Sequence, residues 1–129
     1  VNLGARLESA NKFYGTQIMV GETTYPYIKN EFELRQLDNV KVKGKDKAVK
    51  IYEMLGPTGE VEESILAIRD AYENALEKYN EGNFQSASQL FQELVNLNDS
   101  PAAVMLERCH SLIESPPDNW NGVYAWTSK

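Results

Sequence analysis

The second half of the chain carries apolar side chains at the three- and four-residue intervals of amphipathic helices. The interval runs through VEESILAIRDAYENALEKYNEG (61–82), FQSASQLFQELVNL (84–97) and PAAVMLERCHSLI (101–113). Gly82 and Asn83 interrupt the first stretch, and a polar segment ending in Ser100 and Pro101 precedes the third. Ser100 is expected to cap the third helix, with Pro101 at its first position. The pattern predicts three consecutive helices.

The first half mixes helical and strand patterns. Its apolar positions predict a helix over 1–12, a strand over 16–21, a short helix over 21–32 and then two alternating stretches, FELRQLDNVKV and KAVKIYEML. The turn residues GKDK lie between those stretches, so they predict a β-hairpin. The glycines and proline of LGPTGE (55–60) break the pattern. We therefore expect an α+β chain in two domains, 1–56 and 60–129.

Charge narrows the classes of function. The net charge is −6, which argues against binding long nucleic acids. Residues 41–50 nevertheless carry five lysines and one aspartate, which suits a small anionic ligand. No stretch approaches the roughly 20 apolar residues of a membrane span, and no signal peptide is visible.

The chain has one cysteine and one histidine, which are the adjacent residues Cys109 and His110. An internal disulfide is therefore excluded, and a Cys/His zinc site is not expected. Neighbours on a helix point about 100° apart, so the two side chains do not form a nucleophile–base pair. We expect Cys109 to be a small buried residue, and His110 to lie at the surface or to bind a backbone group.

Asn2 and Arg6 are the first candidates for chemistry. They are four residues apart, so on a helix they share one face. An arginine presents a rigid fork of donors that suits phosphate oxygens, and an asparagine can orient a sugar. Such a pair also occurs by chance on solvated helix faces, so the spacing alone does not decide between the two interpretations.

Three motifs in order add to this evidence. VNLGARLES, QIMVGETTY and FELRQLDNVKVKGKDKAVKIYEML together resemble the C-terminal third of the class III adenylate/guanylate cyclase catalytic domain. The resemblance covers residues 1–55, with Gly4 where alanine is more usual. It implies that this part is a partial ferredoxin-like cyclase fragment of helix, strand, helix and β-hairpin.

The resemblance also implies roles for individual residues. Asn2 matches the asparagine that orients the ribose, and Arg6 matches the arginine that stabilises charge on the α-phosphate as the 3′-oxygen attacks. Lys43 matches the lysine that contacts the terminal phosphates. The other hairpin lysines are expected to be surface residues. Preorganised cations of this kind lower the barrier to expelling pyrophosphate.

The family binds Mg²⁺ or Mn²⁺ through two aspartates on strands that precede the VN motif. Those ligands are not in this chain, and Asp38 and Asp46 are interpreted as turn and surface residues. The family's site forms between two protomers, so the resemblance implies a homodimeric parent that converts ATP or GTP to a 3′,5′-cyclic nucleotide for signalling. We expect the chain to be an inactive C-terminal fragment of a cytoplasmic enzyme region, with any membrane segment upstream.

The helical half resembles one tetratricopeptide repeat. Its end, MLERCHSLIESPPDNWNGVYAWTSK, is similar to the extension of bacterial cyclases that carry an extracytoplasmic sensor. One repeat cannot bury its own apolar face, so the helices must pack on the first half, on the tail or on another copy. In the tail, Trp120, Val123 or Trp126 is expected to dock onto the helices.

Two rival interpretations remain open. The helical half and its aromatic tail suit a non-catalytic module for protein interaction or dimerisation. A degenerate cyclase domain kept for regulation is the other rival, and the presence of Asn2, Arg6 and Lys43 speaks against it.

Overall fold

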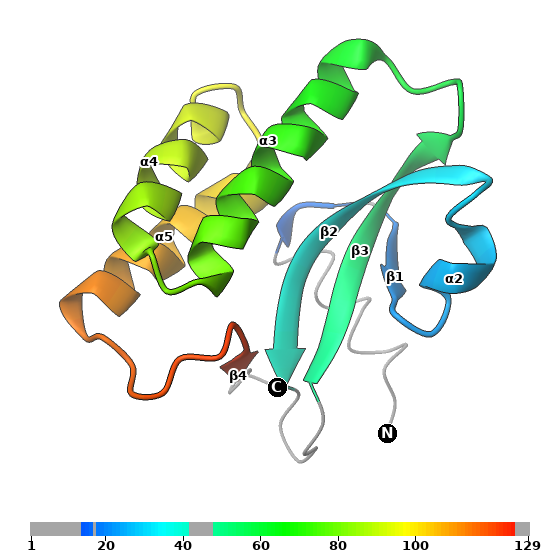
Figure 1. Cartoon of the computed structure of the whole chain (residues 1–129). Coiled ribbons are helices and arrows are strands. Elements are labelled where there is room, and N and C mark those ends of the chain that lie inside the picture. Colours follow the sequence, from blue (N-terminus) through cyan, green and yellow to red (C-terminus); the bar gives the residue numbers. More distant parts are fainter. Residues whose placement is uncertain (1–13, 17, 42–47, 126–129) are drawn as a thin grey trace.

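The computed structural model describes residues 14–16, 18–41 and 48–125 of the chain. It has mixed α and β structure, as the sequence predicts (Figure 1). Its elements, in chain order, are β1 (Met19–Gly21), α2 (Tyr25–Ile28), β2 (Phe32–Lys41), β3 (Ala48–Pro57), α3 (Glu63–Asn80), α4 (Phe84–Val95), α5 (Ser100–Glu114) and β4 (Tyr124–Ala125). The helix expected at 1–12 and the hairpin turn lie outside the described residues.

The sheet is built on the predicted hairpin. Its strand order is β1-β3-β2-β4, and β3 is antiparallel to both β1 and β2. β2 and β3 pair from Phe32 opposite Pro57 to Lys41 opposite Ala48. The fourth strand, β4, comes from the tail and pairs parallel with the last residues of β2. The sequence did not predict this strand, because a two-residue pairing leaves no alternation to detect.

An irregularity in β2 changes which of its residues are buried. Gln36 lies opposite Tyr52 and Asp38 lies opposite Ile51, so Leu37 is the extra residue of a β-bulge. Leu37 and Asp38 are both fully buried. The expectation that Asp38 is a turn and surface residue is therefore wrong.

The three long helices begin and end close to their predicted limits, with one correction at a cap. The side chain of Asn83 accepts a hydrogen bond from Ser86 N at the start of α4. At the start of α5, the cap is Asp99, which accepts from Ala102 N at 3.2 Å, with proline in the first turn. The predicted cap, Ser100, is instead the first helical residue, because the carboxylate one position earlier reaches the free amides.

Helices α3, α4 and α5 lie on one side of the hairpin, whereas β1 and α2 lie on the other side (Figure 1). α3 contacts β2 directly, and α4 packs against both α3 and α5. One hydrophobic cluster joins strand residues to helix residues; its members include Leu37, Ile51, Tyr72, Phe91 and Met105. Of the packing partners that the sequence leaves open, the structure shows the first half of the chain and, through Trp120, the tail. The two-domain division itself stays a prediction.

The tail also packs on the helices, and of the three residues expected to dock there, Trp120 does so. The Trp120 ring makes edge-to-face contacts with Tyr79 and Phe84, each with ring centroids 5.2 Å apart. Its indole nitrogen donates to the Tyr79 carbonyl oxygen at 2.9 Å. Trp126 lies outside the described residues. Trp120 therefore anchors the segment that leads to β4.

Candidate functional site

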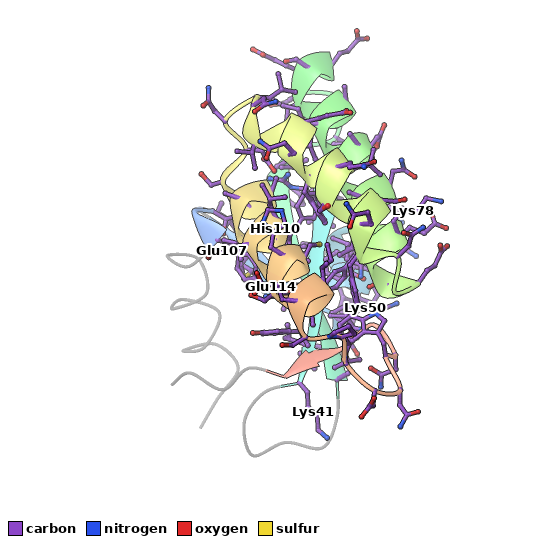
Figure 2. All side chains as sticks on the ribbon, turned by 90° about the vertical axis from the view of Figure 1, so that its left-hand side faces the viewer. Lys41, Lys50, Lys78, Glu107, His110 and Glu114 are labelled. Atoms are coloured by element: carbon purple, nitrogen blue, oxygen red, sulfur yellow. The ribbon has the colours of Figure 1, made fainter. Side chains whose placement is uncertain are left out.

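The three residues that the sequence marks for chemistry lie outside the described part of the chain. Asn2, Arg6 and Lys43 therefore keep their roles as predictions. The residues next to Lys43 along the chain that the structure does describe are Lys41, which ends β2, and Ala48, which begins β3. Lys41 is exposed at the end of the hairpin (Figure 2).

The most deeply buried ion pair among the described residues is formed by Arg108 of α5. Its Nη1 donates to Asp38 Oδ2 at 2.6 Å and to the Tyr79 hydroxyl at 3.2 Å. Its Nη2 lies 3.4 Å from the Tyr14 hydroxyl, which itself donates to Asp38 Oδ2 at 2.5 Å. The guanidinium carbon lies 3.8 Å from the ring centroid of Tyr124. We call these five residues the Arg108 cluster.

Burial makes the charges of the Arg108 cluster strongly interdependent. The side chains of Arg108 and Asp38 are 5% and 0% exposed. The second carboxylate oxygen of Asp38 accepts from Asn39 N at 2.8 Å. Among the described side chains, no buried nitrogen or oxygen lacks a hydrogen-bond partner. The charges are therefore compensated, which a buried ion pair requires in order to be tolerated.

The same environment fixes the protonation states of the cluster. Burial opposes the charge on Arg108, but Asp38 and the neighbouring tyrosines outweigh it and raise the pKa of Arg108 well above its ordinary value. Burial, followed by the charge of Asp38, raises the pKa of Tyr14, and burial also raises the pKa of Tyr79. The arginine stays charged and both tyrosines stay neutral near pH 7. The cluster therefore suits holding parts in place and does not suit proton transfer.

A second buried arginine links the start of α5 to the sheet. Arg35 of β2 donates to Glu53 of β3 at 2.6 Å and to Asp99 at 2.9 and 3.0 Å. Its guanidinium also lies 4.8 Å from the ring centroid of Tyr72. We call these four residues the Arg35 cluster. Asp99 thus caps α5 and pairs with the sheet at the same time.

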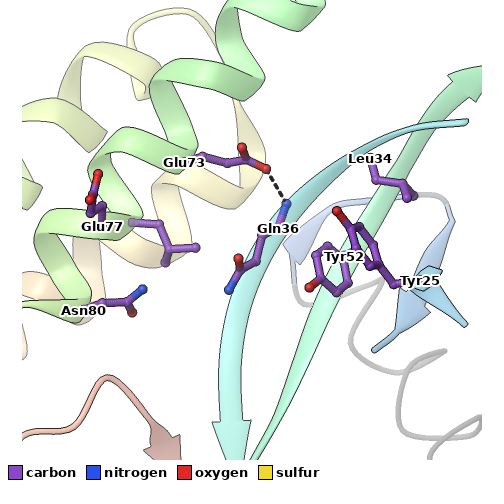
Figure 3. Close-up of a pocket in the computed structure, with 8 residues that line it drawn as sticks. Tyr25, Leu34, Gln36, Tyr52, Glu73, Glu77 and Asn80 are labelled. Atoms are coloured by element: carbon purple, nitrogen blue, oxygen red, sulfur yellow. Dashed lines mark hydrogen bonds between the residues drawn. The ribbon is translucent and has the colours of Figure 1, made fainter. Parts of the chain in front are cut away.

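A pocket of about 330 Å³ opens between α3 and the sheet (Figure 3). Its lining comprises Tyr25, Leu34, Gln36, Tyr52, Glu73, Leu76, Glu77 and Asn80. The rings of Tyr25 and Tyr52 stack with centroids 4.1 Å apart, and Glu73 accepts from Gln36 N at 2.9 Å. The lining has two carboxylates and no lysine or arginine. This pocket does not suit a triphosphate.

Cys109 and His110 lie where the sequence predicts. Cys109 is fully buried, and burial raises the pKa of its thiol to about 12. His110 is exposed on α5 beside Glu107 and Glu114 (Figure 2). The thiol is protonated near pH 7 and the imidazole points away from it, so the pair is not a nucleophile and its base.

Sequence reasoning missed the Arg108 cluster, although a signal was present. The buried face of α5 consists of Pro101, Ala102, Met105, Arg108 and Cys109. These residues recur at helical intervals, so Arg108 lies on the apolar stripe. A charged residue on such a stripe indicates a buried ion pair. The identity of the partner required the tertiary structure, because Asp38 is 70 residues away along the chain.

Two absences bear on cofactors and membranes. Within residues 14–16, 18–41 and 48–125, no group of three or more histidine, cysteine, aspartate or glutamate side chains is placed to hold a metal ion. Over the same residues, every helix is too short or too polar to cross a membrane.

Comparison with known proteins identifies relatives. No protein-family model matches the chain, and no solved structure matches it. An adenylate cyclase of Dictyostelium discoideum, described as terminal-differentiation specific, is 32% identical over 115 residues, covering 84% of this chain and 5% of that protein. Adenylate cyclase 1 of Rhizobium meliloti (strain 1021) is 38% identical over 56 residues, covering 43% of this chain and 8% of that protein. An adenylate cyclase of Anabaena cylindrica is 42% identical over 57 residues, covering 42% of this chain and 11% of that protein.

The lengths of these matches are informative. The chain spans between 5% and 11% of the relatives it matches. The Dictyostelium match is too long to lie within residues 1–56, so it includes part of the helical half. The chain is therefore related to proteins named adenylate cyclase, and in one of them the relationship extends beyond the part that carries the cyclase motifs.

Proposed function

We propose that this chain is the C-terminal portion of a class III nucleotide cyclase catalytic domain with a tetratricopeptide-like helical extension. In the whole enzyme it contributes to the conversion of ATP to 3′,5′-cyclic AMP and pyrophosphate, a phosphorus–oxygen lyase reaction used in intracellular signalling. The observation that carries the proposal is the relationship to three adenylate cyclases, together with the three motifs in residues 1–55. The names of those relatives favour ATP over GTP.

The residues of this chain would supply the positive charge that the reaction needs. As the 3′-oxygen attacks the α-phosphate, negative charge develops there and on the departing pyrophosphate. In the proposal, Arg6 stabilises the charge at the α-phosphate, Lys43 binds the terminal phosphates and Asn2 orients the ribose. Arg6 acts on charge that grows in the transition state, so it lowers the barrier, whereas Lys43 contributes mainly to substrate binding.

Described features are compatible with this assignment. The hairpin that leads to Lys43 is formed, and its end carries the exposed Lys41. The acidic pocket between α3 and the sheet offers no alternative site for phosphates. In the proposal, Mg²⁺ or Mn²⁺ would be held by aspartates from elsewhere in the enzyme and would neutralise the triphosphate. We further propose that the active enzyme is a homodimer, with the metal ligands and the Asn2/Arg6 pair on different protomers.

The alternative of a non-catalytic interaction module has less support. Its strongest element was the aromatic tail, but the Trp120 ring packs on Tyr79 and Phe84 of this same chain. That docking occupies the ring internally.

The test is cyclic-nucleotide production by the full-length protein that contains this chain, with Mn²⁺ and either ATP or GTP. Arg6→Ala is expected to lower kcat by roughly 100- to 1000-fold, the usual effect of removing a group that stabilises transition-state charge. Lys43→Ala is expected mainly to raise KM. Lys29→Ala is the matched control, because Lys29 is an exposed lysine at the end of α2. A wild-type protein that forms no cyclic nucleotide from either substrate would refute the proposal.

A further inference from the structure

Arg108 connects segments that are far apart in the sequence. It lies 70 residues from Asp38 and 94 residues from Tyr14, and it contacts both. Tyr14 and Asp38 are 24 residues apart and are hydrogen-bonded to each other. Tyr124, from the tail, covers the guanidinium with its ring. One side chain of the helical extension therefore holds three other parts of the chain.

The segments held by Arg108 lead to the proposed phosphate-binding residues. Asp38 precedes Lys41, the last residue of β2, by three positions, or about 10 Å of extended strand. Two positions beyond Lys41 comes Lys43. Tyr14 follows Arg6 by eight positions. β4 pairs with Val40 and Lys41, so the tail also contacts this end of β2.

The chemistry of the Arg108 cluster suits fixing the relative positions of its residues better than it suits stabilising the fold. A buried ion pair loses the solvation of both charges, and apolar side chains of similar volume often stabilise a protein equally well or better. A planar guanidinium that shares a carboxylate with a tyrosine hydroxyl nevertheless allows one relative arrangement of its partners. The cluster is also fully hydrogen-bonded, so any shift of one segment breaks a buried contact.

We propose that Arg108 is a positioning residue through which the helical extension sets the relative placement of the segments that end at Tyr14 and at Lys41. The inference rests on the proposed cyclase function, because Arg6 precedes Tyr14 by eight residues and Lys43 follows Lys41 by two. In this proposal the helical extension contributes to catalysis by positioning residues of the cyclase part. The relationship to the Dictyostelium cyclase, which includes part of the helical half, agrees with this role.

The Arg35 cluster provides a matched control. Arg35 is also a buried arginine that joins α5 to the sheet, through Asp99 and Glu53. It differs in position, since it contacts the start of α5 and lies six residues before the end of β2. Loss of either arginine should weaken the packing of α5 on the sheet. Loss of Arg108 should in addition disturb the end of the hairpin and the segment at Tyr14.

The test compares Arg108→Met with Arg35→Met in the full-length enzyme, below the unfolding temperature of each variant. Arg108→Met is expected to lower kcat about tenfold or more, because small displacements of catalytic groups have large effects on rate. Arg35→Met is expected to lower thermal stability while kcat and KM stay near the wild-type values. Arg108→Lys is expected to recover part of the activity. Equal losses of kcat in the two methionine variants, or wild-type kcat in Arg108→Met, would overturn the inference.

A milder pair of variants serves if Arg108→Met does not fold. Tyr14→Phe removes the hydroxyl that bonds to Asp38, whereas Tyr72→Phe removes a buried hydroxyl that donates to the Leu37 carbonyl at 2.8 Å. Only Tyr14→Phe is expected to lower kcat. Equal kcat values in the two variants would contradict the role of the cluster.

A readout independent of activity separates this inference from the proposed function. Spin labels at residues 16 and 41, in a protein without native cysteines, report the distance between the segment at Tyr14 and the end of β2. Arg108→Met should broaden the distance distribution and Arg35→Met should leave it narrow. A wild-type protein without cyclase activity would refute the proposed function, and the label distances would then decide the positioning role of Arg108. A distance distribution that Arg108→Met leaves unchanged would overturn the positioning role.

Discussion

At the scale of the residue, the buried hydroxyl and thiol groups are the most sensitive to pH. Burial raises the pKa of Cys109 from its ordinary value of 9.0 to about 12, and it raises the pKa values of Tyr14, Tyr72 and Tyr79 above 10.0. In each case the folded protein retains a proton that the unfolded chain releases. The stability that these groups contribute is fully present below the unfolded pKa and is lost as the pH rises towards the folded pKa.

This linkage predicts a stepwise loss of stability at alkaline pH. Between pH 9 and 10 the thiol is the first of these groups to titrate in the unfolded chain, so the free energy of unfolding should fall by about 1 kcal/mol over this interval. Cys109→Ala should remove this first step and keep the later fall above pH 10, which the tyrosines cause. Urea unfolding of both proteins between pH 7.5 and 11 measures the difference. Parallel curves for the two proteins would contradict the assignment to Cys109.

At the scale of the element, α5 is held to the sheet at two points by arginine pairs, one at its start and one past its middle. Asp99 accepts a hydrogen bond from Ala102 N, and both of its carboxylate oxygens accept from Nη1 of Arg35. Farther along α5, Arg108 pairs with Asp38. α4 has a simpler start, since the Asn83 side chain accepts from Ser86 N at 3.3 Å in an exposed position. Asn83 therefore only caps its helix, whereas Asp99 both caps α5 and forms an ion pair with the sheet.

Removing the two caps should have unequal effects. Asn83→Ala should lower the free energy of unfolding by about 1 kcal/mol, the usual contribution of a cap. Asp99→Ala should lower it by about 2–4 kcal/mol, because Arg35 also loses one of its two carboxylate partners while it stays buried. Denaturant unfolding of each variant provides the comparison. Equal losses would mean that the pairing of Asp99 with Arg35 adds nothing to the cap.

At the scale of the whole molecule, the sheet and the helices share their core. The same hydrophobic cluster contains Leu37 and Ile51 from the hairpin and Tyr72 and Met105 from the helices. Side chains of α3 also bond to the backbone of β2: Tyr72 donates to the Leu37 carbonyl and Glu73 accepts from Gln36 N. Neither half can lose its structure without exposing apolar surface of the other.

The shared core predicts a single cooperative unfolding transition for the described part of the chain. Amide hydrogen exchange under native conditions should give similar opening free energies for the centres of β2, β3 and α3. The contrary result is a helical half that keeps slow exchange under conditions where the hairpin amides exchange freely. That result would support the division into domains 1–56 and 60–129 as independent folding units.

The sequence by itself determined the hairpin, the three long helices and the order in which they follow one another. Alternation in 32–42 and 47–55 indicated the hairpin, and helical periodicity indicated α3, α4 and α5, because these patterns depend on residues that are close along the chain. It also indicated that Cys109 is buried and that one of Trp120, Val123 or Trp126 packs on the helices, since aromatic and thiol side chains tend to be buried; the structure selects Trp120. The motifs in residues 1–55 indicated the relationship to adenylate cyclases, and the roles of Asn2, Arg6 and Lys43 rest on them.

Only the tertiary structure decided which charges are buried and what they hold together. Asp38 looked like a surface carboxylate because a buried charge is costly, and nothing near it in the sequence compensates that cost. Its partner Arg108 is 70 residues away, and the bulge at Leu37 lies next to it in β2. Parallel pairing of β4 with the end of β2 is equally non-local. Such contacts depend on how the elements pack, so local patterns do not encode them individually.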